Sequence, residues 1–133
     1  MKTFDTVIAN IIKKDPRYPY NAYLFVREAL EFTIKNLYPE NTVQGHNIHI
    51  PGQKLLEGIR EFALLQYGPL TLTVLNEWNI KTSEDFGYIV FNLVENGILT
   101  KTDEDNIDDF KNGYNFYDAF QKPFLPNSHP NTN

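Results

Sequence analysis

Apolar residues recur at helical spacing between Thr82 and Gly97. They occupy positions i, i+3, i+4, i+7 and i+8 and therefore share one face of a helix: Phe86, Ile89, Val90, Leu93 and Val94. Thr82 and Asp85 have the spacing of a capping box at the start of this helix, and Gly97 supplies a residue that can end it. The pattern predicts a capped helix with one buried face.

Four more helices are predicted from the same periodicity, over about residues 4–14, 21–37, 52–67 and 70–78. The first ends where Asp15 meets Pro16, because a residue before proline disfavours helical backbone. The second is apolar nearly all round, which indicates a central, buried helix. Gly58 within the third suggests close packing, and Gly68-Pro69 ends that helix and begins the next.

The order of elements favours a winged-helix-like half over about residues 53–118. Ile98 and Leu99 are expected to tuck beneath the last helix, residues 100–102 to leave as a strand, and Asn112-Gly113 to turn at the wing tip. The alternative is a plain helical bundle. Aromatic residues between 114 and 124 are expected to fold back onto the helices. We therefore predict a mainly α, five-helix single domain over residues 1–124, with a short extended wing and a flexible tail over 125–133.

Composition agrees with one compact domain. The 133 residues are 41% hydrophobic and 14% aromatic, which is enough for a core. There is no cysteine, so disulfides and thiolate metal sites are excluded. Charges interrupt the apolar pattern of residues 1–14, which excludes a signal peptide or membrane span there. We expect a cytoplasmic protein.

Acidic residues are concentrated in the last helix and the predicted wing. Residues 82–118 contain nine acids and two lysines, a local net charge of −7, whereas the whole chain carries −5. Acidic residues oppose binding to phosphate backbones and favour a basic protein partner. The candidate interaction residues are Glu84, Asp85, Asp103, Glu104, Asp105, Asp108 and Asp109.

A second candidate site combines arginine and tyrosine. Arginine suits forked contacts with carboxylates or phosphates. Three arginines lie near acidic residues in the sequence and could form inter-helix ion pairs or, alternatively, an anion or ligand pocket. The candidate residues are Arg17, Tyr18, Tyr23, Arg27 and Arg60.

Metal and cofactor motifs are weak or absent. His46 and His49 share an H-x-x-H spacing, but outside a helix this spacing places no two ligands on a common face. The acids from Asp103 onward fail the calcium-loop pattern, because Asp108 and Tyr114 stand where glycine and glutamate are required. No nucleophile elbow or phosphate-binding glycine loop occurs. We predict no metal and no cofactor, and an enzyme is the least supported class.

Several segments resemble the uncharacterised bacterial family often labelled Minf-type. The resemblance covers about residues 4–124 and rests on these matches: Asp15-Pro16-Arg17-Tyr18, residues 22–30, Gly52-Gln53, residues 55–60, Asp85-Phe86-Gly87, residues 90–94, Lys101-Thr102, Asp109-Phe110, Phe116 and Ala119-Phe120. It implies a single unit and transfers no activity, cofactor or catalytic residue.

Three functional hypotheses follow. The first is a non-enzymatic, intracellular protein-interaction module that binds a basic partner through the acidic helix and wing. The second is a winged-helix regulator that binds nucleic acid, which the local charge of −7 disfavours. The third is a small-molecule or anion sensor built on the arginine and tyrosine residues.

Overall fold

Over the residues that the structure describes, the chain folds into five α-helices, with short helical elements following them toward the C-terminal end. The α-helices of the computed structural model are α1 (Phe4–Lys14), α2 (Tyr20–Leu37), α3 (Gly52–Tyr67), α4 (Thr71–Glu77) and α5 (Ser83–Glu95). The short elements are the 3-10 helices η2 (Gly68–Leu70), η3 (Ile107–Phe110) and η5 (Lys122–Phe124) and the π-helical turn η4 (Tyr117–Gln121). The structure describes residues 3–37, 50–99 and 107–126. It is mainly helical, as predicted.

Local chemistry explains where the helices begin and end. Thr3 Oγ1 accepts a hydrogen bond from the Thr6 backbone N–H at 3.1 Å and caps α1. Thr82 and Asp85 form the predicted capping box at the start of α5. At the other end, Gly97 adopts a φ of +80°, and the Ile98 N–H turns back to the Leu93 carbonyl at 2.9 Å. These helix boundaries are confirmed.

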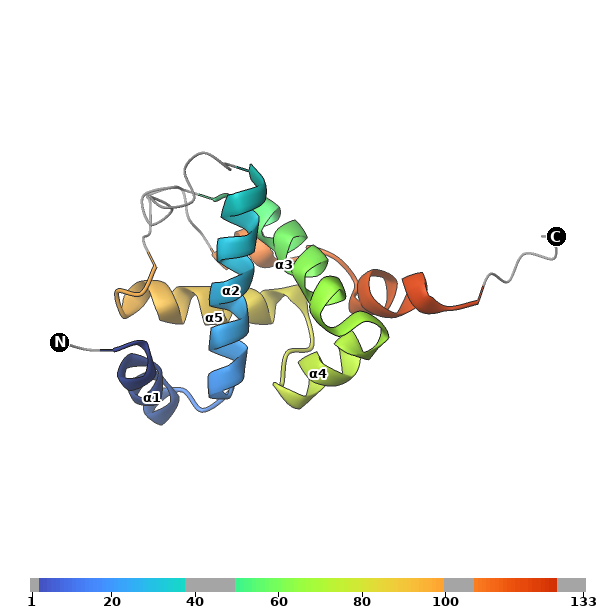
Figure 1. Ribbon diagram of the computed structural model, residues 1–133. Coiled ribbons are helices and arrows are strands. Elements are labelled where there is room, and N and C mark those ends of the chain that lie inside the picture. Colours follow the sequence, from blue (N-terminus) through green and yellow to red (C-terminus); the bar gives the residue numbers. More distant parts are fainter. Residues whose placement is uncertain (1–2, 38–49, 100–106, 127–133) are drawn as a thin grey trace.

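Helix α2 runs through the middle of the molecule, with α5 crossing it and α3 packing alongside (Figure 1). Helices α1, α3 and α5 all contact α2, as expected of a central helix, but its burial is one-sided, because Glu28, Glu31 and Lys35 are exposed on the opposite half of the helix. Phe25 on α2 and Phe86 on α5 are 2% and 0% exposed. A Cβ added to Gly58 of α3 would lie 1.7 Å from Thr33 Oγ1 of α2. The two helices thus approach at a point where only glycine fits.

The C-terminal segment folds back onto the helices, as its aromatic content predicted. Phe110 packs against Gly87 of α5, and its carbonyl accepts a hydrogen bond from Ser83 Oγ at 2.6 Å. The Tyr114 hydroxyl donates to the Leu56 carbonyl of α3 at 2.7 Å. Phe116 and Phe120 are buried with ring centroids 5.1 Å apart. Residues 107–120 therefore complete the core on the side of α3 and α5.

The expected wing is not found in the described part of the chain, which contains no strand; residues 100–106 lie outside it. Asn112-Gly113 is not a projecting tip. The Gly113 N–H donates to Ser83 Oγ at 3.1 Å, and a Cβ on Gly113 would lie 2.6 Å from Leu56. The turn is held down because Phe110 and Phe116 on either side of it are buried.

Two further predictions concern the ends and the membrane. Leu125 and Pro126 are exposed, and the rest of the predicted tail, 127–133, lies outside the described residues. Across the ranges that the structure describes, none of the helices has the length and hydropathy required to cross a membrane.

Candidate functional site

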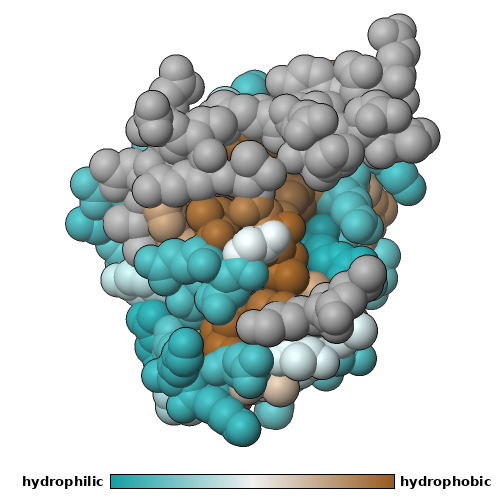
Figure 2. All heavy atoms as spheres, turned by 90° about the vertical axis from the view of Figure 1, so that its left-hand side faces the viewer, coloured by the Kyte–Doolittle hydropathy of each residue, from teal (hydrophilic) through white to brown (hydrophobic). Residues whose placement is uncertain are grey.

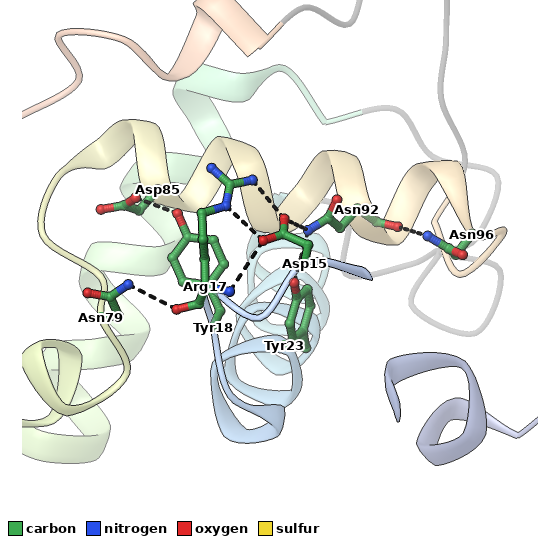
Figure 3. A network of polar contacts seen from close by, with 8 residues as sticks. All are labelled: Asp15, Arg17, Tyr18, Tyr23, Asn79, Asp85, Asn92 and Asn96. Atoms are coloured by element: carbon green, nitrogen blue, oxygen red, sulfur yellow. Dashed lines mark hydrogen bonds and ion pairs between the residues drawn. The ribbon is translucent and has the colours of Figure 1, made fainter. Parts of the chain in front are cut away.

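A polar network joins the connection between α1 and α2 to the surface of α5 (Figure 3). Asp15 and Arg17 flank Pro16 and form a forked ion pair. Arg17 Nε donates to Asp15 Oδ1 at 2.9 Å, and Nη2 donates to Oδ2 at 2.7 Å. Because proline restricts the backbone of the residue before it, the pair belongs to a stiff turn rather than to a flexible loop.

The Arg17 guanidinium lies beside two aromatic rings. Its Cζ is 4.5 Å from the centroid of Tyr88 on α5 and 5.3 Å from that of Tyr18. The Arg17 carbonyl accepts a hydrogen bond from Asn79 Nδ2 at 2.9 Å. The cation thus has a carboxylate in its fork and aromatic side chains next to it, which stabilise a charged group at the surface.

Asn92 connects this ion pair to α2 and α5. Its Nδ2 donates to Asp15 Oδ2 at 3.0 Å and to the Tyr23 hydroxyl at 2.9 Å. Asn96, one helical turn later, donates to the Asn92 carbonyl at 2.8 Å. A single amide therefore ties together residues from the turn, from α2 and from α5 (Figure 3).

Asp85 has two structural tasks at the start of α5. Its Oδ2 accepts backbone N–H bonds from Lys81 at 2.7 Å and Thr82 at 3.1 Å. Its Oδ1 accepts a hydrogen bond from the hydroxyl of Tyr18, whose ring is buried. The carboxylate caps the helix and anchors the turn, so it is not a free acidic group.

The pKa shifts of Asp15, Tyr18 and Tyr23 move these three groups away from titration near neutral pH. The hydrogen bond from Arg17 holds the pKa of Asp15 well below its ordinary value, and the hydrogen bond from Asn92 lowers it further. Burial raises the pKa of Tyr18, and its bond to Asp85 raises it more. Burial also raises the pKa of Tyr23. The network holds an ionised aspartate and protonated tyrosines, which is an arrangement for positioning rather than for acid–base catalysis.

The structure brings together three of the five residues predicted to form an anion pocket: Arg17, Tyr18 and Tyr23. It does not bring the other two arginines to them. The Cζ of Arg27 lies 4.5 Å from the Phe4 ring, and its Nε is 3.8 Å from the Glu31 carboxylate. Arg60 lies on α3, close enough to Tyr114 to affect its titration. Arg27 and Arg60 therefore lie beside other residues than those that surround Arg17.

Sequence reasoning missed Asn79, Tyr88 and Asn92 as members of the network. One signal could have found two of them. Tyr88 and Asn92 follow Asp85 at i+3 and i+7, and those positions share one helical face with the capping carboxylate.

The candidate acidic residues have different environments. Asp103, Glu104 and Asp105 lie outside the described residues. Asp108 is exposed and forms an ion pair with Lys111 at 2.9 Å, while Glu84 and Asp109 are half-buried. Gln53 Nε2 of α3 donates to the Asp109 carbonyl at 2.8 Å. Acidic side chains thus lie at η3 and at the start of α5. Asp85 is one of them, but its carboxylate is engaged in capping α5 and in the bond with Tyr18.

No three potential metal ligands come together within residues 3–37, 50–99 and 107–126. The predicted pair His46 and His49 lies outside these ranges. Every buried side-chain nitrogen or oxygen within these ranges has a hydrogen-bond partner. The buried polar side chains of these ranges are therefore satisfied by the fold itself.

A set of large apolar side chains is exposed at the C-terminal end of the molecule. They are Leu65 of α3 (71% exposed), Leu70 of η2 (63%), Tyr117 of η4 (51%), Phe124 of η5 (42%) and Leu125, which follows η5 (42%). We call these five residues the C-terminal apolar surface. Contacts between η4 and both α3 and η2 bring these elements together. Periodicity alone did not single out the two leucines.

No family model, curated protein or solved structure matches this chain. The resemblance to the Minf-type family remains a prediction from the quoted residues.

Proposed function

We propose that this protein is a non-enzymatic protein-interaction module that binds a basic partner. The observation that carries the proposal is the C-terminal apolar surface, where Leu65 and Leu70 are 71% and 63% exposed. Apolar side chains of this size gain free energy when a partner removes them from water, and aromatic residues such as Tyr117 are enriched in interfaces. Five such side chains on elements that contact one another fit a contact surface better than they fit the single, scattered apolar residues found on ordinary protein surfaces.

Charge favours a basic partner. Glu61 lies one helical turn before Leu65 on α3 and is exposed, and Asp118 follows Tyr117 in η4. The chain as a whole carries −5, and residues 82–118 carry −7. Lysine and arginine side chains of a partner would accelerate encounter with such a surface, in a manner that salt weakens.

The alternative functions receive less support. A winged-helix regulator would present α5 to nucleic acid, but Arg17 lies over Tyr88, and Phe110 packs against Gly87, on two sides of that helix. Its acidic residues would also meet phosphate oxygens of like charge. An anion sensor built on Arg17 would have to displace Asp15 from the arginine fork, where the contacts are 2.7 and 2.9 Å.

The proposal is tested by comparing the interactions of wild-type protein with those of a Leu65→Ser/Leu70→Ser variant. Both proteins, tagged at the N-terminus, are expressed in the native cell, and co-purifying proteins are identified by mass spectrometry. A candidate partner is then purified and titrated against both proteins. The variant should bind at least about tenfold more weakly, a loss of about 1.4 kcal/mol, and wild-type binding should fall as salt is raised.

Leu37→Ser is the matched control, because Leu37 is a leucine of α2 that is 41% exposed and lies outside the C-terminal apolar surface. This variant should bind like wild type. A partner that binds both variants equally would contradict the proposal. Micromolar binding of mixed-sequence DNA or RNA at about 0.15 M salt would instead support the regulator.

A further inference from the structure

A small hollow lies between α1 and the C-terminal end of α5, far from the C-terminal apolar surface. Its volume is about 190 Å³, and it is lined by Val7, Asn10, Lys13, Lys14 and Asn96. Figure 2 views the molecule from the side on which α1 lies and shows apolar side chains at the bottom of a furrow with hydrophilic side chains along its edges. The lining of the hollow itself combines one apolar residue, Val7, with four polar ones.

Both lysines at the hollow are free of carboxylate partners within the described chain. The ion pairs of that part of the molecule involve other cations, namely Arg17, Arg27, Lys111 and Lys122. Asp15 directly follows Lys14, but Arg17 holds both of its oxygens. Two lysines thus line one cavity with no ion pair to a carboxylate of residues 3–37, 50–99 or 107–126, although the whole chain carries −5.

The two asparagines add neutral hydrogen-bonding groups. Asn96 Nδ2 donates a hydrogen bond to the Asn92 carbonyl at 2.8 Å, which orients the amide, and among the described residues this is the one side-chain hydrogen bond of Asn96. Asn10 lies on the α1 side of the hollow, one turn before Lys13 and Lys14. Polar residues of α1 and of the C-cap of α5 therefore line the same hollow.

We propose that this hollow binds a small anion that carries a phosphate group. A phosphate monoester has a charge of about −1.5 to −2 near neutral pH, which two ammonium groups match, whereas one carboxylate would leave a positive charge in excess. Size limits the ligand, because pockets that enclose a drug-sized molecule have volumes of about 300–1,000 Å³. The volume of about 190 Å³ fits inorganic phosphate or a compact monoester rather than an enclosed nucleotide.

The experiment is an NMR titration of the full chain, labelled with ¹⁵N, at constant ionic strength. The probes are inorganic phosphate and glycerol phosphate, with sodium chloride as the reference. Saturable shifts should occur at Asn10, Lys13, Lys14 and Asn96, with a Kd of about 1 mM or tighter. Tighter binding of glycerol phosphate would assign the site to phosphorylated metabolites, and tighter binding of inorganic phosphate would assign it to the free ion.

The variant is Lys13→Gln/Lys14→Gln, and the matched control is Lys35→Gln/Lys54→Gln. Both remove two positive charges, but Lys35 and Lys54 do not line the hollow. Affinity should fall at least about tenfold in the first variant, by about 1.4 kcal/mol, and by less than twofold in the control. Equal losses in the two variants would show non-specific attraction and overturn the proposal, as would the absence of saturable shifts at the lining residues in wild type.

The last turn of α1 offers a competing explanation, because lysines there also offset the helix dipole. That role would lower the melting temperature of the Lys13→Gln/Lys14→Gln variant without any phosphate dependence in wild type. Under our proposal, phosphate should raise the melting temperature of wild type and of the control variant but not of the Lys13→Gln/Lys14→Gln variant.

Discussion

The network around Arg17 and the C-terminal apolar surface meet water in opposite ways. The network contains the residue types associated with function, namely arginine, aspartate and tyrosine, yet each is occupied by another residue of the chain. The C-terminal apolar surface contains residue types associated with cores, yet Leu65 and Leu70 are 71% and 63% exposed. From residue type alone, the Arg17 network would have been assigned to ligand binding and the five apolar residues to the core.

The difference teaches that availability matters more than residue type. A charged side chain whose hydrogen bonds are satisfied inside the fold has little to offer a ligand, because a ligand would first have to break those bonds. An exposed leucine has no such competing interaction to lose. We therefore propose the apolar surface as the binding site of a partner, and we regard the Arg17 network as a clamp that holds the α1–α2 turn on α5.

The largest expected effect comes from Phe86, because its side chain is fully buried and packs against Phe116, which directly precedes Tyr117 of the C-terminal apolar surface. Phe86 directly follows Asp85 of the network, and its ring centroid is 5.7 Å from that of Phe116 in the C-terminal segment. Phe86→Ala should lower the free energy of unfolding by about 3–5 kcal/mol, the usual cost of emptying a buried phenylalanine site. Urea unfolding followed by circular dichroism measures this loss, and a loss below about 1 kcal/mol would mean that the two regions do not share this core.

A smaller effect is expected from the clamp, and it should depend on pH. Asp15→Asn removes the charge that pairs with Arg17, whose side chain is 47% exposed. Solvent screening at that exposure reduces the cost to about 1 kcal/mol near neutral pH. Because folding lowers the pKa of Asp15, its contribution is present above the ordinary aspartate pKa of about 4 and is lost as pH falls below it.

The stability gap between wild type and Asp15→Asn should therefore be constant from about pH 8 to pH 5 and should shrink toward pH 2. Urea midpoints of both proteins, measured across this pH range, test whether the stability gap shrinks in acid. Asp118→Asn serves as a control, since its 3.9 Å contact with Lys122 is exposed and should contribute little at any pH. A gap that widens in acid would contradict the assignment of the charge to the clamp.

The smallest effect on stability should come from the C-terminal apolar surface. Leu65→Ser and Leu70→Ser should each change the free energy of unfolding by less than about 0.5 kcal/mol, because exposed side chains lose little contact area when they are truncated. Differential scanning calorimetry of the double variant measures this change. A clear destabilisation would show that these leucines pack within the fold and would remove the basis for the interaction surface.

The helices were predictable because their causes are local. Thr82 with Asp85 caps α5, Asp15-Pro16 ends α1, and Gly97 ends α5 in a positive φ, each through atoms a few residues apart. Gly58 could be recognised as a point of close packing, although its contact with Thr33 could not be. The anion pocket was predicted only in part, because whether Arg17, Arg27 and Arg60 face one another depends on helix orientation, which spacing along the chain does not contain.

The amino-acid pattern by itself thus determined which segments are helical, that α2 is central, and that the aromatic C-terminal segment returns to the core. Tertiary structure alone decided that Phe110 packs against Gly87 and accepts a hydrogen bond from Ser83, where a wing hairpin was expected. It also decided that Asn92 links Asp15 to Tyr23 and that Leu65 is exposed to water. The physical reason is range. Capping and periodicity act within a few residues, whereas burial and hydrogen-bond pairing depend on which distant segments fill the same space.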